Sequence, residues 1–127
     1  MSRRSERIAE AIRRVVSITI QAHLRDPRVS RYATITKVEL TPDLRYAKIY
    51  YTVLGEDKEK KRVEKGLQSA KGFIRKCIGD ELELRYAPDI SFRIDEKAEY
   101  AKRIEDVLTK LKKEAQDGTD KKDNKRD

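Results

Sequence analysis

Apolar residues in the first part of the chain recur every three or four positions, which is the period of an amphipathic helix. They are Ile8, Ile12, Val15, Val16 and Ile20. The pattern predicts a helix over residues 5–24 that buries one face. Asp26-Pro27 should end this helix, because proline disfavours the helical conformation of the residue before it.

Two strands are predicted next, over Ala33–Leu40 and Tyr46–Leu54, with a turn between them at residues 41–44. In the second strand the apolar residues alternate, which is typical of a strand with one buried face. In the first strand, Ile35 is out of phase with the apolar residues that follow it. This change of phase predicts a β-bulge near Thr36-Lys37.

A longer helical pattern fills the segment between Gly55 and Gly79. Its apolar side carries Val63, Leu67, Ala70, Ile74, Cys77 and Ile78. Gly66 and Gly72 lie inside the pattern, and each costs roughly 1 kcal/mol of helix stability relative to alanine. The two glycines therefore predict a kinked helix, and Gly79 is expected to end it.

A third strand is predicted at Asp89–Asp95, and a last helix at about Glu96–Ala115. The apolar face of this helix consists of Ala101, Ile104, Leu108 and Leu111. Residues 116–127 contain no such side chain and are expected to form a disordered charged tail. The order α-β-β-α(kinked)-β-α predicts an α+β domain over residues 1–115, with a three-stranded sheet and helices on one face.

The basic charge is concentrated in the first two thirds of the 127 residues. The net charge is +8 and the pI is about 9.6, and residues 1–55 carry 11 basic side chains against 5 acidic ones. A folded surface with a basic side is typical of a protein that binds a phosphate backbone. No apolar run is long enough to cross a membrane, and Met1 is not followed by a signal-peptide pattern. A single cysteine, Cys77, fits a reducing compartment. We expect a cytoplasmic monomer that does not bind membranes.

The sequence offers no pattern for catalysis or metal binding. His23 and Cys77 stand alone, whereas zinc sites need several such ligands at set spacings. Neither of the common glycine-rich phosphate-binding motifs occurs. We therefore expect a protein that is not an enzyme and that uses no metal or other cofactor.

Two groups of basic side chains are candidates for contact with nucleic acid. Opposite the apolar stripe of the first helix are Arg3, Arg7 and Arg14. On the outer side of the central helix are Lys71, Arg75 and Lys76. Gly72 lies among the second group, where it permits a bend and the close approach of a phosphate backbone. A solvated charged face is the alternative interpretation of both groups. Tyr46 and Tyr50, on one face of the second strand, are candidates either for base stacking or for simple packing.

Short motifs follow one another over about residues 5–112. The N-terminal motifs are Leu24-Arg25-Asp26-Pro27-Arg28, Thr34-Ile35-Thr36-Lys37-Val38-Glu39-Leu40, Pro42-Asp43-Leu44 and Ala47-Lys48-Ile49-Tyr50. The C-terminal motifs are Ser69-Ala70-Lys71-Gly72-Phe73-Ile74-Arg75, Leu84-Arg85 and Ala87-Pro88-Asp89-Ile90-Ser91-Phe92. With these motifs in this order and at this spacing, the chain resembles the ribosome-binding factor A family. Members of that family are bacterial assembly factors of the small ribosomal subunit.

The resemblance implies a type II KH-like fold and a noncatalytic, RNA-binding function. It implies that the protein binds the immature small (30S) subunit through ribosomal RNA and assists late maturation of the 5′ end of 16S rRNA. It also implies a role in adaptation to cold, with other assembly factors as further partners. The alternative is a general basic nucleic-acid-binding or protein-interaction module that is not tied to ribosomes.

The resemblance also assigns residues. Ordinary KH domains clamp RNA with a GxxG loop, which this chain lacks. The family has instead a helix–kink–helix around Ala-x-Gly, which corresponds here to Ser69 and Ala70-Lys71-Gly72. It also implies that Arg85 faces RNA, and that Arg28 either does so or neutralises a nearby carboxylate. The complete set of expected RNA-binding residues is Arg3, Arg7, Arg14, Arg28, Lys71, Arg75, Lys76 and Arg85.

Overall fold

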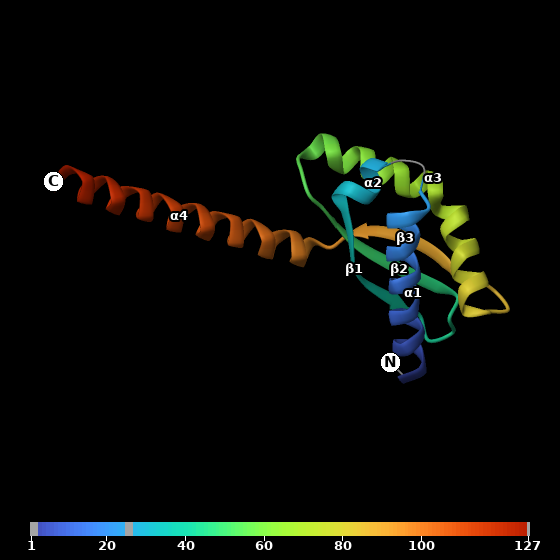
Figure 1. Cartoon of the computed structure of the whole chain (residues 1–127). Coiled ribbons are helices and arrows are strands. Elements are labelled where there is room, and N and C mark those ends of the chain that lie inside the picture. Colours follow the sequence, from blue (N-terminus) through green and yellow to red (C-terminus); the bar gives the residue numbers. More distant parts are fainter. Residues whose placement is uncertain (1–2, 25–26, 127) are drawn as a thin grey trace. The chain divides into compact units, whose positions relative to one another are not determined.

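The computed structural model describes residues 3–24 and 27–126, with the side chains of all of these except Arg28 and residues 117–126. Two helices and two strands are followed by a helix, a strand and a last helix (Figure 1). The elements are α1 (Arg3–Ala22), α2 (Pro27–Tyr32), β1 (Ala33–Leu40), β2 (Tyr46–Val53), α3 (Asp57–Leu82), β3 (Asp89–Ile94) and α4 (Glu96–Arg126). The predicted α+β class and the predicted order of the strands and long helices are confirmed.

The three strands form one sheet with β2 in the centre, in the order β1-β2-β3. β1 and β2 pair antiparallel, and β2 and β3 pair parallel. A parallel pair needs a crossover connection, which α3 provides between β2 and β3. The predicted bulge is confirmed, because the pairing register shifts between Ile35 and Lys37 and leaves Thr36 outside the ladder.

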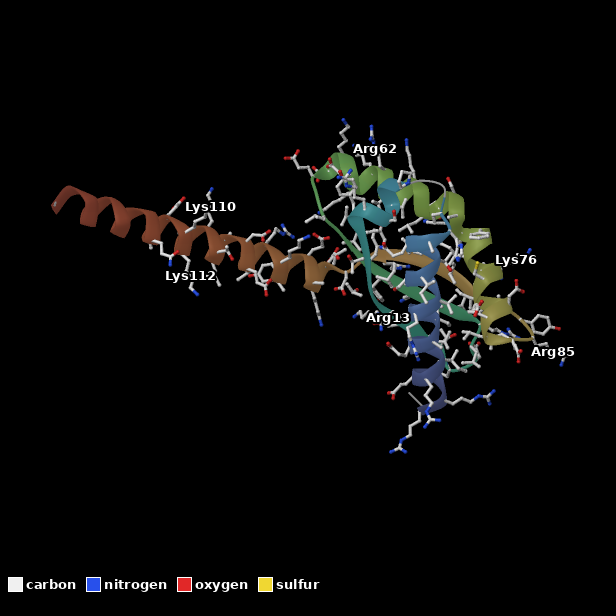
Figure 2. The ribbon with its side chains drawn as sticks, viewed as in Figure 1. Arg13, Arg62, Lys76, Arg85, Lys110 and Lys112 are labelled. Atoms are coloured by element: carbon white, nitrogen blue, oxygen red, sulfur yellow. The ribbon has the colours of Figure 1, made fainter. Side chains whose placement is uncertain are left out.

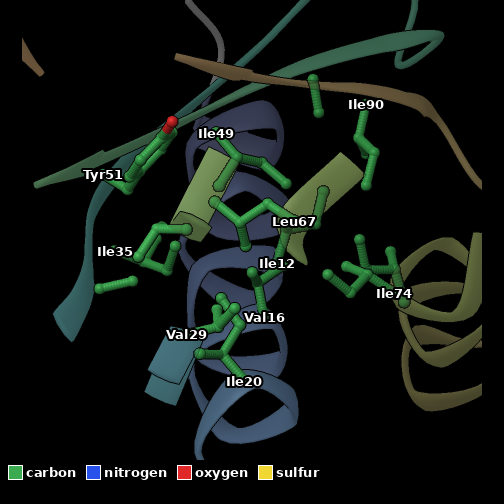
Figure 3. Close-up of a cluster of buried hydrophobic side chains, with 14 of the residues drawn as sticks. Ile12, Val16, Ile20, Val29, Ile35, Ile49, Tyr51, Leu67, Ile74 and Ile90 are labelled. Carbon is green, nitrogen blue, oxygen red and sulfur yellow. The ribbon is translucent and has the colours of Figure 1, made fainter. Parts of the chain in front are cut away.

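Alternate residues of β2 point into the core on one face of the sheet. Ala47, Ile49, Tyr51 and Val53 are all at most 3% exposed. α1 packs Ile12, Val16 and Ile20 into this core, and α3 adds further aliphatic side chains including Leu67 and Ile74 (Figure 3). Each buried aliphatic side chain stabilises the fold by about 1.5–3 kcal/mol relative to an exposed one. The buried faces predicted for the first helix and the second strand are confirmed.

The bulge residue makes a tertiary contact across the sheet. The Thr36 hydroxyl donates a hydrogen bond of 2.7 Å to the Asp95 carboxylate, just after β3. Asp95 is only 9% exposed, so this carboxylate lies largely out of water. The bond therefore joins the edge strand β1 to the end of the opposite edge strand.

The helix α2 was not predicted, because Pro27 was interpreted only as the end of the first helix. Proline is favoured at the first position of a helix, where its fixed φ fits and its missing N–H needs no partner. Pro27 is the first residue of α2, and the Ser30 hydroxyl donates to its carbonyl at 2.9 Å. Val29 is fully buried in the core, so packing holds this single short helix in place.

The central helix ends later than predicted. We expected Gly79 to end it, but α3 continues to Leu82 and its left-handed C-cap residue is Glu83, with φ 50°. The Glu83 N–H donates to the Gly79 carbonyl. Leu82 packs against the core cluster, and this contact favours the additional turn. The ribbon of α3 changes direction between its green and yellow parts in Figure 1.

The last helix also differs from expectation. α4 runs to Arg126 rather than ending near Ala115, since no proline interrupts this segment and helical hydrogen bonds need only local partners. The chain divides into two compact units, Met1–Asp95 and Glu96–Asp127. That residues 1–115 fold as one domain stays a prediction. The expected apolar face of α4 is solvent exposed, with Ile104, Leu108 and Leu111 exposed by 43–57%.

Candidate nucleic-acid interface

Lys71, Gly72 and Lys76 lie on the outer side of the second half of α3. Lys76 and Gly72 are exposed and Lys71 is half-buried. A Cβ atom added at Gly72 would meet nothing within 4 Å, and Gly72 does not have a positive φ. Gly72 therefore borders open space with an ordinary helical backbone, which leaves room for a partner's backbone to approach.

Arg75 lies on the same helix but has partners within the fold. Its guanidinium donates to the Pro88 carbonyl at 3.1 Å and to the Ala87 carbonyl at 3.3 Å. These bonds fasten the segment before β3 to α3. Arg75 is half-buried, so it has a structural role in the fold. Contact of Arg75 with RNA stays a prediction.

A cleft of about 570 Å³ lies between the start of α1, the β1–β2 turn, α3 and the loop before β3. Four arginines from these four segments line it. They are Arg4, Arg45, Arg75 and Arg85. Tyr46 and Tyr86 also line the cleft, and they are exposed by 56% and 78%. Figure 2 shows the Lys76 and Arg85 side chains pointing outward near the C-terminal end of α3.

Two carboxylates lie in the same cleft, and one of them is committed to the turn. Asp43 accepts hydrogen bonds from the Thr41 hydroxyl at 2.6 Å and from the Arg45 N–H at 3.1 Å. These bonds lower the pKa of Asp43, with the Thr41 bond as the main cause. With Asp89 as the second carboxylate, four guanidiniums face two acids, and the cleft keeps a positive charge.

A second cleft of about 630 Å³ lies beside the middle of α3. Ser69 and Ala70 line it, together with Phe73, Arg62 and Lys65. Phe73 is 47% exposed. The residues expected at the helix kink therefore border a partly apolar hollow with cations at its rim.

The arginines expected on α1 are exposed but lie apart from the first cleft. In the described part of the chain, α1 contributes Arg4 and Ile8 to that cleft, not Arg3, Arg7 or Arg14. The neighbouring Arg13 pairs with Glu10, and its hydrogen bond lowers the pKa of that carboxyl. The side chain of Arg28 falls outside what the structure describes.

The two strand tyrosines have different surroundings. Tyr50 donates a hydrogen bond to Glu39 at 3.2 Å, and the Lys37 ammonium lies 4.6 Å from its ring centroid. Burial, followed by the bond to Glu39, raises the pKa of Tyr50. Tyr46 is instead exposed at the edge of the arginine-lined cleft. Of the two, only Tyr46 presents an open ring next to cations.

The described residues offer cations and exposed rings to an anionic partner. Among them, no three His, Cys, Asp or Glu side chains come together as a potential metal site. None of the described helices combines the length and the apolar composition that a membrane span requires. Guanidiniums, ammoniums and exposed rings bind phosphates and bases without breaking bonds.

Sequence reasoning missed Arg4, Arg45 and Tyr86. No local signal marks them, because their importance comes from the meeting of three segments that are distant in sequence. Arg85 was expected from the family resemblance, and the structure adds that its guanidinium lies 5.7 Å from the Tyr86 ring centroid.

The fold and the cleft define the class of this protein. It is a small α+β protein with a three-stranded sheet and a basic cleft whose guanidiniums can pair with phosphates. The profile of the family described as ribosome-binding factor A matches residues 4–108. The ribosome-binding factor A of Geotalea daltonii is 46% identical over 121 residues, which are 95% of this chain and 98% of that protein. The chain therefore belongs to the ribosome-binding factor A family.

Solved structures agree in fold. The crystal structure of ribosome-binding factor A from Thermus thermophilus matches with a TM-score of 0.62 at 20% identity, covering 71% of this chain and 94% of that chain. A homology model of the Thermus thermophilus ribosome binding factor A, fitted into a cryo-EM map of a 30S complex, matches with a TM-score of 0.57 at 21% identity. That match covers 70% of this chain and 92% of the other.

Proposed function

We propose that this protein is a noncatalytic assembly factor that binds the immature small (30S) ribosomal subunit through ribosomal RNA. In that complex it assists late maturation of the 5′ end of 16S rRNA. The observation that carries the proposal is the group of cations on the second half of α3, with Lys76 exposed and Lys71 half-buried, in a member of the ribosome-binding factor A family. The relative from Thermus thermophilus that has been fitted into a 30S complex supports the choice of partner.

In this proposal Lys71 and Lys76 contact phosphates, and Gly72 lets the RNA backbone approach α3. Lys76 is exposed and Gly72 borders open space, as such contacts require. Arg3, Arg7, Arg14 and Arg28 are further candidate contacts, supported by the basic charge of the N-terminal half of the chain. We also propose that the bend of α3 lies at Ser69, Ala70 and Gly72.

Sedimentation of a lysate through a sucrose gradient tests the choice of partner. We expect the protein to travel with free small subunits and to be absent from translating ribosomes. Cells that lack the protein should accumulate 16S rRNA with an unprocessed 5′ end, most strongly in the cold. A general basic nucleic-acid-binding module would instead spread over all RNA-containing fractions, and that result would reject the proposal.

Charge reversal tests the surface on α3. We expect Lys71→Glu combined with Lys76→Glu to weaken binding to purified small subunits, because phosphate contacts dominate affinity and its salt dependence. Each lost contact should lower the salt slope of binding by roughly 0.7–0.9. Arg75 is left unchanged because its bonds to Ala87 and Pro88 hold the fold.

A matched control for this charge reversal is available on α4. Lys110→Glu combined with Lys112→Glu makes the same change of charge on exposed residues of the other unit (Figure 2). The control should bind more tightly than the α3 variant. Equal loss in both would mean that overall charge, rather than the surface on α3, determines binding.

A further inference from the structure

We propose that the arginine-lined cleft binds one unpaired nucleotide of RNA, with its base stacked on Tyr86 and its phosphates held by Arg4, Arg45 and Arg85. The proposal rests on the proposed RNA-binding function and adds a specific ligand class and site to it. The cleft volume of about 570 Å³ lies within the range of roughly 300–1,000 Å³ that is typical of small-ligand sites.

The loop that carries Tyr86 is fastened before any ligand arrives. At its start, the Leu84 N–H donates to the Gly79 carbonyl at 3.2 Å, and at its end the Asp89 N–H donates to the Arg45 carbonyl at 2.8 Å. Between these points Arg75 holds the carbonyls of Ala87 and Pro88. Binding therefore needs little ordering of the backbone, which makes a stacking contact on this loop more favourable.

The exposure of Tyr86 is the feature that indicates a base. Its side chain is 78% exposed although it lies on a fixed loop. Removal of a large aromatic ring from water lowers the free energy, so a partner that covers this ring would be stabilised. Stacking of a base on an aromatic ring is favourable for every base, because each has a flat π face. Tyr46, 56% exposed at the same cleft, offers a second ring.

The charges indicate the rest of the nucleotide. Guanidiniums bind phosphate oxygens through paired N–H donors, and the cleft brings them together from α1, the β1–β2 turn and the loop before β3. Arg85 lies 5.7 Å from the Tyr86 ring centroid, so phosphate and base contacts would be adjacent, as they are in a nucleotide. The carboxylates of an acidic peptide would pair with the guanidiniums but would not stack on the exposed rings of Tyr46 and Tyr86.

Two probes separate base stacking from charge alone. They are a fluorescein-labelled single-stranded RNA of about ten nucleotides and inorganic polyphosphate, which carries phosphates but no bases. Tyr86→Ala should weaken binding to the RNA by roughly 5- to 150-fold and leave binding to polyphosphate unchanged. Tyr86→Phe should bind the RNA within about twofold of wild type, because the ring is retained. Arg85→Gln should weaken binding to both probes.

A matched control is Tyr100→Ala, which removes another exposed tyrosine from α4 in the other compact unit. This variant should bind both probes as the wild type does. Wild-type binding of the RNA by Tyr86→Ala would overturn the cleft proposal. So would tighter binding of a polyglutamate peptide than of the RNA, which would identify a protein partner instead.

The result for the cleft can be separated from the result for the ribosomal function. The RNA probe tests the cleft without any ribosome, and the sucrose gradient tests the ribosomal partner without any variant of Tyr86. One possible result is that Tyr86→Ala loses RNA binding while the wild-type protein does not sediment with small subunits. This result would support the cleft proposal and reject the ribosomal proposal. Binding to small subunits that is unaffected by Tyr86→Ala, together with unaffected RNA binding, would leave the ribosomal proposal standing and reject the cleft.

Discussion

At the scale of single residues, Arg75 shows how a charged side chain that looks free in the sequence acquires a partner in the fold. Its spacing on the helix matches that of Lys71 and Lys76, so the sequence groups the three together. In the structure Arg75 donates to two backbone carbonyls of the loop before β3. The position of a charged side chain on the outer face of a helix therefore does not by itself show whether it binds a partner or stabilises the fold.

We expect Arg75→Ala to lower the free energy of unfolding by roughly 1–3 kcal/mol, because hydrogen bonds to a charged donor are lost and the carbonyls of Ala87 and Pro88 lose their partner. Urea unfolding followed by circular dichroism measures the change. The exposed Lys76→Ala is the control and should remain within about 0.5 kcal/mol of wild type. Equal stability of the two variants would contradict the structural role of Arg75.

Gly72→Leu should leave stability unchanged or raise it by up to about 1 kcal/mol, because Gly72 lacks a positive φ and an added Cβ meets open space. The bulky side chain should at the same time weaken binding to small subunits, since it fills the space proposed for the RNA backbone. Thermal unfolding and subunit binding are measured on the same preparation.

The control for Gly72→Leu is Gly79→Ala, which raises helix propensity later in α3, where a Cβ would make an ordinary contact of 3.5 Å with Ala87. It should bind subunits like the wild type. Weakened binding of both variants would attribute the effect to helix propensity rather than to access at Gly72.

At the scale of elements, the bulge in β1 does more than interrupt a pairing register. It turns Thr36 toward a mostly buried carboxylate at the end of β3. We expect Thr36→Val to lower the free energy of unfolding by roughly 1.5–3 kcal/mol, the typical value of a hydrogen bond to a charged group. Chemical denaturation measures this, and Thr34→Val, at an exposed position of the same strand, should change little.

The end of α4 gives a second prediction at this scale. Deletion of residues 116–127 should change the melting temperature of the rest of the chain by no more than about 1–2 °C, because α4 belongs to the second compact unit and these residues carry no apolar side chain. Differential scanning calorimetry tests this. A fall of several degrees would mean that the segment stabilises the domain. Whether these residues are disordered in solution stays a prediction, which backbone NMR shifts of the full chain can test.

At the scale of the whole molecule, the net charge of +8 is the feature that a partner would meet first. We expect the purified protein to contain no stoichiometric metal and to hydrolyse no nucleotide, because no group of potential metal ligands occurs in the described part of the chain and the sequence has no common phosphate-binding loop. Elemental analysis and a phosphate-release assay measure both. Hydrolysis that survives repeated purification would contradict this expectation.

The sequence by itself determined the local structure of this protein. The period of apolar residues gave the class of each strand and long helix, the buried faces of α1 and β2, and the bulge at Thr36. These features depend on neighbours within a few positions, and so the pattern of a short segment suffices. The motifs in their order also sufficed to predict the family, which the comparisons confirm.

Only the tertiary structure decided which distant residues meet. The parallel pairing of β2 with β3 and the partners of Arg75 depend on contacts between separate elements. Packing of Val29 and Leu82 against the core supports the helix at Pro27 and the extra turn before Glu83. The cleft is the clearest case, because Arg4, Arg45 and Tyr86 look ordinary where they stand in the sequence. Their proximity arises because α1, the β1–β2 turn and the loop before β3 converge on one core, and burial of that core fixes their positions through contacts that no local pattern encodes.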